Sequence, residues 1–244
     1  MLAILTNGLI MLAEIAATVA VAALGYHYPM YFAAITAALT LALGARLEYA
    51  RLTHELPFYF EGGGGRWRMA ATLAMTAGET VLKAALAGIA ALVTFSGTDQ
   101  GRLFVVAVVF GVAVYVGAAL VRRLAISFGA RPLRWGYFRL AVPLGLLFSL
   151  ALAFLPAPSF TDLGRQLIFD LPQRPSLGQA SELLFVLKQK FDEMVAAMLA
   201  WLLPADWARI VGALVSVNVL TGFVASVYAA VIASAVNAAE TRML

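Results

Sequence analysis

The chain has 244 residues, of which 63% are hydrophobic and only 12% charged, and its formal net charge is +4. Soluble domains carry about 45–50% apolar and about 25% charged residues, so this composition excludes an ordinary soluble enzyme, a disordered chain and a fibrous one. It predicts an all-α, polytopic membrane helix bundle. Because the chain has no cysteine and two histidines, we expect no metal site and no cofactor.

Six segments are apolar enough to be membrane spans, since a hydrocarbon core of about 30 Å takes about 20 helical residues. The two shortest are expected to borrow flanking residues or to thin the bilayer. An α-helical extension into the cytoplasm is expected after the second span, ending at Pro57. The whole chain, 1–244, is then one membrane domain. The spans are residues 2–24, 30–45, 69–95, 103–121, 140–155 and 210–239.

Basic residues give the expected topology. Ten of the 17 Lys and Arg residues lie in the connections 46–68 and 122–139 and at the C-terminus, which six spans place on one side. Lys and Arg are retained on the cytoplasmic side of membranes. We therefore predict an inner (cytoplasmic) membrane protein with both termini in the cytoplasm. The positive charge is thus attributed to topology, and nucleic acid is not an expected partner.

The connection before the third span contains four consecutive glycines, 62–65, followed by Arg66, Trp67 and Arg68. A glycine run beside basic residues can indicate a phosphate-binding loop, but the Lys-Ser/Thr pair and the preceding strand of that motif are missing. We interpret the segment as a hinge whose side chains contact lipid headgroups. The same contact is predicted for Arg122 and Arg123, after the fourth span.

The long connection 157–206 is predicted to lie outside, and it contains an amphipathic helix at about 178–203. Ser176 and Gln179 have the spacing of a capping box at its start. Two interpretations stay open: a surface for a partner protein or lipid, and a lid packed over the chain's own bundle. The apolar residues at helical spacing are Leu184, Leu187, Phe191, Met194, Met198 and Leu202.

Three ionisable residues fall inside predicted spans: Glu14, Glu79 and Lys83. A charge at the bilayer centre costs about 2.5–3.5 kcal/mol on insertion scales, so such residues must face the bundle interior, water or a partner. Glu79 and Lys83 stand at i,i+4 and can neutralise each other, and the hydroxyls of Thr76 and Thr80 lie nearby. One interpretation is a proton or ion path, and the other is a buried polar cluster that fixes helix packing.

The last span carries a ridge of small residues at four-residue steps. Such ridges let helix backbones approach closely in lipid. The contact is expected either within the chain or with another subunit. The ridge consists of Asn218, Gly222, Ser226, Ala230 and Ser234.

Three functions follow from these patterns. The first is a non-catalytic membrane subunit that docks on other membrane proteins, or forms a homo-oligomer, through the last span and the outer helix. The second is a small transporter or ion-conducting protein that uses Glu14, Glu79 and Lys83. The third is a lipid-modifying enzyme at the inner face. No catalytic residue is assigned, because neither His-Glu-x-x-His nor Gly-x-Ser-x-Gly occurs. The residues considered for the third function are Glu48, His54, Glu55 and Glu61.

Overall fold

The computed structural model describes residues 2–59, 65–96, 100–153 and 221–243, together with scattered residues between 183 and 220. No strand occurs in these ranges, and helices make up nearly all of them. The predicted all-α membrane helix bundle is therefore confirmed. The helices are α1 (Leu2–His27), α2 (Pro29–Tyr59), α3 (Gly65–Thr94), α4 (Gln100–Phe128), α5 (Pro132–Arg139), α6 (Ala141–Ala153) and α10 (Thr221–Met243).

Five of these helices, α1, α2, α3, α4 and α10, are long and apolar enough to cross a membrane. The predicted span 140–155 corresponds to a shorter apolar helix, because α6 has 13 residues and a rise of 1.5 Å per residue gives it a length of only about 20 Å. The basic residues before it form the separate short helix α5, with Pro132 at the first position, where the missing amide hydrogen costs nothing.

Two helix bounds differ from the bounds expected from the sequence. Helix α2 does not end at Pro57 but includes it and continues to Tyr59. The last span was expected from residue 210, whereas α10 begins at Thr221 and extends past 239 to Met243. Residues 213–219, between α10 and the helical residues Val211 and Gly212, lie outside the described residues.

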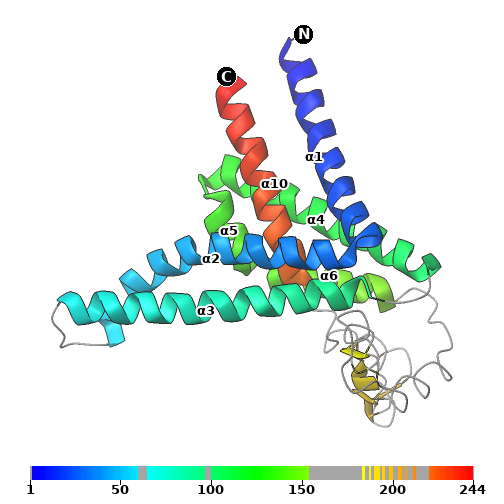
Figure 1. The fold of residues 1–244 in the computed structure, drawn as a ribbon. Coiled ribbons are helices and arrows are strands. Elements are labelled where there is room, and N and C mark those ends of the chain that lie inside the picture. The colour runs from blue at the N-terminus through cyan, green and yellow to red at the C-terminus, as the bar shows by residue number, and fades with distance from the viewer. Residues whose placement is uncertain are drawn as a thin grey trace.

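Helix α10 is the centre of the bundle. It packs on α4, α5 and α6, while α1 packs mainly on α4. Helices α2 and α3 lie side by side as an antiparallel hairpin, which crosses α10 at a wide angle and extends well beyond it (Figure 1). The two chain termini lie at the same end of the molecule in that view.

Aromatic rings join four parts of the chain at the core. The ring of Phe32 on α2 stacks on Tyr228 of α10 at 5.3 Å and meets Phe95 and Phe110 edge-on at 5.0 and 5.7 Å. Edge-to-face pairs of this kind add to the burial energy of each ring. The Phe95 ring fits only because residue 25 is glycine, since a Cβ there would lie 2.6 Å from two of its ring carbons.

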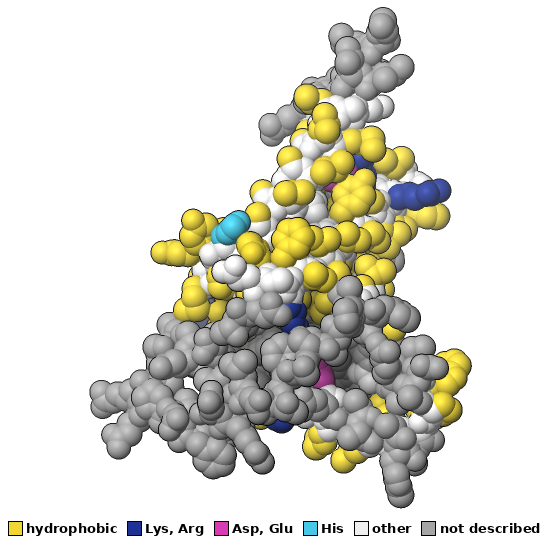
Figure 2. Space-filling model, turned by 90° about the vertical axis from the view of Figure 1, so that its right-hand side faces the viewer, with side chains coloured by type: hydrophobic (Ala, Val, Ile, Leu, Met, Phe, Trp, Pro, Cys, Tyr) yellow, Lys and Arg dark blue, Asp and Glu magenta, His cyan; other side chains and the backbone are white. Residues whose placement is uncertain are grey.

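The outer faces of the long helices are apolar. On α1, for example, Leu9, Leu12 and Val19 are about three-fifths exposed, and many hydrophobic side chains cover the coloured part of the face seen in Figure 2. Soluble monomers rarely expose contiguous apolar patches of this extent. The surface is that of a protein whose solvent is lipid.

Candidate functional site

The charged residues of the hairpin form one network, here called the hairpin cluster. The Lys83 ammonium donates to Glu48 Oε1 on α2 and, at 3.2 Å, to Glu79 Oε2 on its own helix. Arg51 bridges Glu79 at 2.7 Å, Glu48 at 3.1 Å and Glu55 at 3.4 Å. Acids and bases thus alternate across the contact between α2 and α3, and this arrangement locks the two helices in register.

The exposed fraction of the side chains increases from one end of the hairpin cluster to the other. The Glu48 side chain is 6% exposed and Lys83 17%, whereas Arg51 and Glu55 are 43% and 46% exposed. The buried pair is therefore the part that matters for stability, because exposed ion pairs contribute about 0–1 kcal/mol.

A second network, here called the core triad, joins three helices. Arg122 of α4 donates from Nη1 to Glu14 Oε2 of α1 at 3.2 Å and from Nη2 to Glu240 Oε1 of α10. The Glu14 side chain is only 4% exposed, and Arg122 and Glu240 are 20% and 18% exposed. One guanidinium therefore holds two carboxylates that come from opposite ends of the chain.

The ion pairs divide the polar cluster predicted from the sequence between two places in the fold. Glu79 and Lys83 belong to the hairpin cluster, whereas Glu14 belongs to the core triad. Thr76 and Thr80 are buried on α3, and their hydroxyls have no hydrogen-bond partner. No ion pair among the described residues connects Glu14 to Glu79 or Lys83.

Tyr137 of α5 lies beside the hairpin cluster. Its hydroxyl donates to the Thr40 carbonyl at 3.1 Å, and a Cβ at Gly44 would lie 2.6 Å from the Tyr137 hydroxyl oxygen and 2.9 Å from the Thr80 methyl carbon. Gly44 therefore lets α3 and α5 approach α2 at one point. Burial, and in second place the charge of Glu48, raise the pKa of Tyr137 well above its ordinary range, so the hydroxyl remains a donor at neutral pH.

The described part of the small-residue ridge packs inside this chain. A Cβ at Gly222 would lie 2.1 Å from the Ala141 carbonyl oxygen and from the Gly145 nitrogen of α6. Ser226 is fully buried and donates to the Tyr137 carbonyl at 3.2 Å. Ala230 meets Gly136, and Ser234 is half-buried. Asn218 lies outside the described residues.

Of the residues expected to contact lipid headgroups, all but Arg122 are exposed on the surface. Arg66, Trp67 and Arg68 are exposed at the start of α3, and Arg123 is exposed on α4. Arg122 instead turns into the core triad. The sequence did not identify it as a partner of Glu14, because helix α4 continues seven residues beyond the predicted end of the span and carries Arg122 with it.

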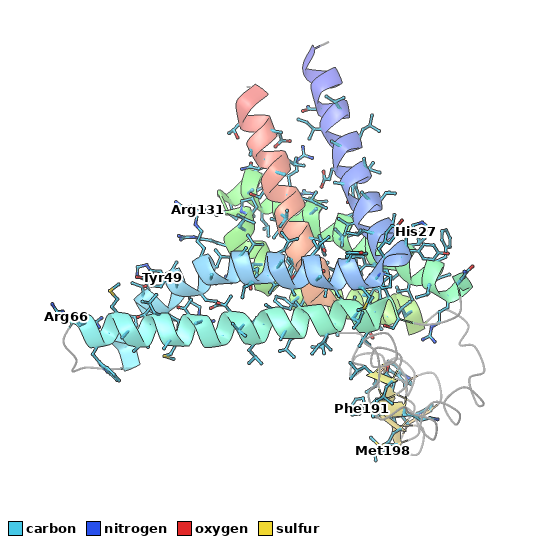
Figure 3. All side chains as sticks on the ribbon, viewed as in Figure 1. His27, Tyr49, Arg66, Arg131, Phe191 and Met198 are labelled. Carbon is cyan, nitrogen blue, oxygen red and sulfur yellow. The ribbon has the colours of Figure 1, made fainter. Side chains whose placement is uncertain are left out.

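The expected outer helix falls mainly outside the described residues. Its described members at helical spacing are in helical conformation, and their large apolar side chains are exposed. Phe191 and Met198 are labelled in Figure 3. This outer stripe consists of Leu184, Leu187, Phe191, Met194 and Met198, which are between 37% and 65% exposed.

The described residues contain no group of three or more His, Asp or Glu side chains that could hold a metal ion. The fold and these clusters define a class, the polytopic membrane helix bundle with buried ion pairs. Comparison with protein-family models, with curated proteins and with solved structures found no match.

Proposed function

We propose that this membrane protein is a non-catalytic subunit that assembles with other membrane proteins, and that it docks through the free end of the α2–α3 hairpin. This end, here called the arm, comprises residues 48–59 of α2 and 65–79 of α3. The observation that carries the proposal is its projection: the hairpin extends well past α10 and α5 (Figure 1).

The arm has its own interior. Leu52, Leu56 and Thr72 are at most 7% exposed where α2 and α3 run side by side, and the hairpin cluster fixes the register at its base. Burial of these side chains and the ion pairs hold the two helices against each other along the arm. A stiff projection of this kind presents a preformed surface, which lowers the ordering cost of binding.

The outer surface of the arm has the composition of a protein interface. Arg66 and Arg68 are exposed beside its apolar residues, and Arg51 is 43% exposed. Aromatic residues, Met and Arg are the types enriched at protein interfaces and at their energetic hot spots. The exposed apolar members are Tyr49 at 41%, Phe58 at 86%, Trp67 at 70%, Met69 at 59% and Met75 at 42%.

The docking surface proposed here differs from the one expected from the sequence, which was the last span together with the outer helix. Residues 224–230 of α10 are at most 4% exposed, so this part of the last span is occupied by the chain's own helices. The outer stripe, whose side chains are exposed, is a second docking surface in addition to the arm.

We also propose an inner-membrane location with both termini in the cytoplasm. His27 lies at one side of the molecule, whereas Tyr49, Arg66 and Arg131 lie at the opposite side (Figure 3). The basic connections thus gather away from the His27 turn, and the termini share one end. This separation supports an arrangement in which the tip of the arm and the α4–α5 connection face the cytoplasm.

The test is purification of the full chain from its native membrane in a mild detergent, followed by mass measurement. We expect a defined assembly, with another membrane protein or with further copies of this chain, that is lost in Trp67→Glu. Ile126→Glu is the matched control, because Ile126 is 69% exposed and belongs to α4 rather than to the arm. A wild-type chain that runs as a lone monomer, or an equal loss in both variants, contradicts the proposal.

A further inference from the structure

Helices α1 and α4 leave an apolar groove between them, here called the α1–α4 groove. Its volume is about 560 Å³, and ligand pockets usually have about 300–1,000 Å³. Its floor is made of small residues: Ala22 and Ala107 are 9% and 6% exposed, and a Cβ at Gly111 would meet the Ala22 Cβ at 3.4 Å. Larger side chains stand beside the floor, with Val19 60% and Val108 49% exposed. Small residues between large ones therefore hollow this face of the bundle.

The groove has about the depth of one leaflet of a bilayer. Its lining extends over residues 15–27 of α1 and 104–115 of α4, which is about 18 Å and about 17 Å at 1.5 Å per residue. Both segments belong to helices that are long and apolar enough to span a membrane. Half of a hydrocarbon core of about 30 Å is about 15 Å. The groove thus matches the depth that the acyl chains of one leaflet occupy.

One end of the groove has the character of a membrane interface. His27 is the last residue of α1 (Figure 3), and its ring lies 4.7 Å from that of Tyr26, which meets the Phe104 ring of α4 at 6.3 Å. Tyr28 and Tyr31, which follow, are 59% and 69% exposed. Tyrosine rings gather at the headgroup level of membranes. This end therefore lies where a lipid headgroup lies.

The other end of the groove is closed. The lining stops at residue 15 of α1, and the preceding residue, Glu14, pairs with Arg122 of α4 at 3.2 Å. This ion pair joins the two helices beyond the groove. Between the ends the lining is apolar apart from the hydroxyls of Thr18 and Tyr115, and the Thr18 hydroxyl donates to the Glu14 carbonyl oxygen at 2.8 Å.

We propose that the α1–α4 groove binds one acyl chain of a bilayer phospholipid, whose headgroup lies beside His27. The imidazole of His27 can donate a hydrogen bond to an ester or phosphate oxygen at that end. A spanning helix of a partner fits less well, because its length of about 30 Å would extend past the groove, over the point where Glu14 and Arg122 join α1 to α4. The site involves neither the arm nor the outer stripe, and it goes beyond the proposed function.

The first test uses the wild-type full chain in vesicles of phosphatidylcholine that contain a photoactivatable phosphatidylcholine. The reactive group is placed either next to the ester or at the end of one acyl chain. The sample is irradiated after solubilisation in a mild detergent, which dilutes the bulk lipid. We expect adducts near His27 and Phe104 from the first reagent, and near Ile15 and Val112 from the second. Val81 and Leu82 of α3, which are 59% and 61% exposed, are the reference for bulk lipid and should lose their adducts.

The second test fills the groove. Ala23 is half-buried in the lining, whereas Ala20 is exposed on the same helix and does not belong to the lining. Mass measurement of the intact chain in the same detergent should show one retained phospholipid per wild-type chain. Ala23→Trp should lose this lipid, and the matched control Ala20→Trp should retain it.

Three results overturn the proposal. The first is a wild-type chain that retains no lipid, or a second protein chain in its place. The second is a folded Ala23→Trp variant that retains as much lipid as Ala20→Trp. The third is a pair of reagents that label the same residues, or that label Val81 and Leu82 as strongly as the groove after solubilisation. The adduct pattern is measured on the wild-type chain, so it decides the proposal even if Ala23→Trp does not fold.

Discussion

The core triad and the hairpin cluster contain the same chemistry and differ in what surrounds it. Each has one carboxylate more than it has bases, and each is organised by an arginine. In the triad every member is at most 20% exposed, whereas Arg51 and Glu55 of the hairpin cluster are 43% and 46% exposed. The excess charge of the hairpin cluster reaches its surface, and that of the triad does not.

The comparison teaches that the burial of a charged cluster, rather than its number of ion pairs, decides its structural role in this fold. The buried cluster ties three distant helices together through one shared arginine. A graded cluster sets the register between two helices and leaves charges for a partner or for headgroups. The following variants test this distinction.

The largest effect is expected for Arg122→Gln. It leaves the carboxylates of Glu14 and Glu240 without their shared cation, and removing one partner of a buried ion pair costs about 3–5 kcal/mol. Unfolding in detergent, followed by loss of helical signal, measures it. The double variant Arg122→Gln with Glu14→Gln should recover part of the loss. A change near zero would place the triad in a watery environment like that of Arg51.

A smaller loss is expected for Lys83→Met. Glu48, whose side chain is 6% exposed, loses its hydrogen bond from Lys83 but keeps Arg51 at 3.1 Å. Hydrogen bonds to charged groups contribute about 1.5–3 kcal/mol, which bounds the effect. Lys83→Arg serves as the control that retains a cation. An equal loss of unfolding free energy in Lys83→Met and Arg122→Gln would contradict the view that the hairpin cluster is less buried than the core triad.

A Gly→Ala substitution on α10 and another on α3 compare how tightly the two helices are packed. Gly222→Ala places a Cβ 2.1 Å from backbone atoms of α6, so α10 and α6 must separate, at a cost of about 1–3 kcal/mol. Gly78→Ala on α3 meets nothing within 4 Å and should stabilise the helix by about 0.5–1 kcal/mol. Thermal unfolding of the two variants should shift in opposite directions, and shifts of the same sign would contradict the packing described for α10.

The smallest effect is expected for Arg51→Gln, because Arg51 is 43% exposed and exposed ion pairs contribute about 0–1 kcal/mol. Salt screens exposed charges but not buried ones. The difference between Arg51→Gln and wild type should therefore shrink as salt is added, whereas that of Arg122→Gln should persist. Unfolding curves at low and high ionic strength provide the check.

The sequence predicted the membrane helix bundle because hydropathy reports whether a segment is apolar enough to lie in the bilayer rather than in water. It placed α1 to α4 and α10, but it began the last span 11 residues before Thr221 and counted α6, which has 13 residues, as a span. The reason is that an apolar run does not show where it bends or where it is too short to cross.

The sequence also identified Glu14, Glu79 and Lys83 as residues that need partners, but it could not supply those partners. Arg122 is 108 residues from Glu14 and 118 from Glu240, and only the packing of α1, α4 and α10 brings them together. Arg122 carried one available signal: helical spacing continues beyond residue 121, which puts its side chain on the buried face of Ala118 rather than in a loop. The i,i+4 pair Glu79 and Lys83, which is local, was predicted from spacing alone.

The central claim is that this membrane bundle presents its arm to another protein while its other apolar faces meet lipid. Because the chain has no cysteine, a single cysteine carrying a photoactivatable crosslinker can replace Trp67 on the arm or Val112 on α4, which are 70% and 52% exposed. In native membranes we predict protein adducts at position 67 and lipid adducts at position 112. Lipid adducts alone at both positions would contradict the account.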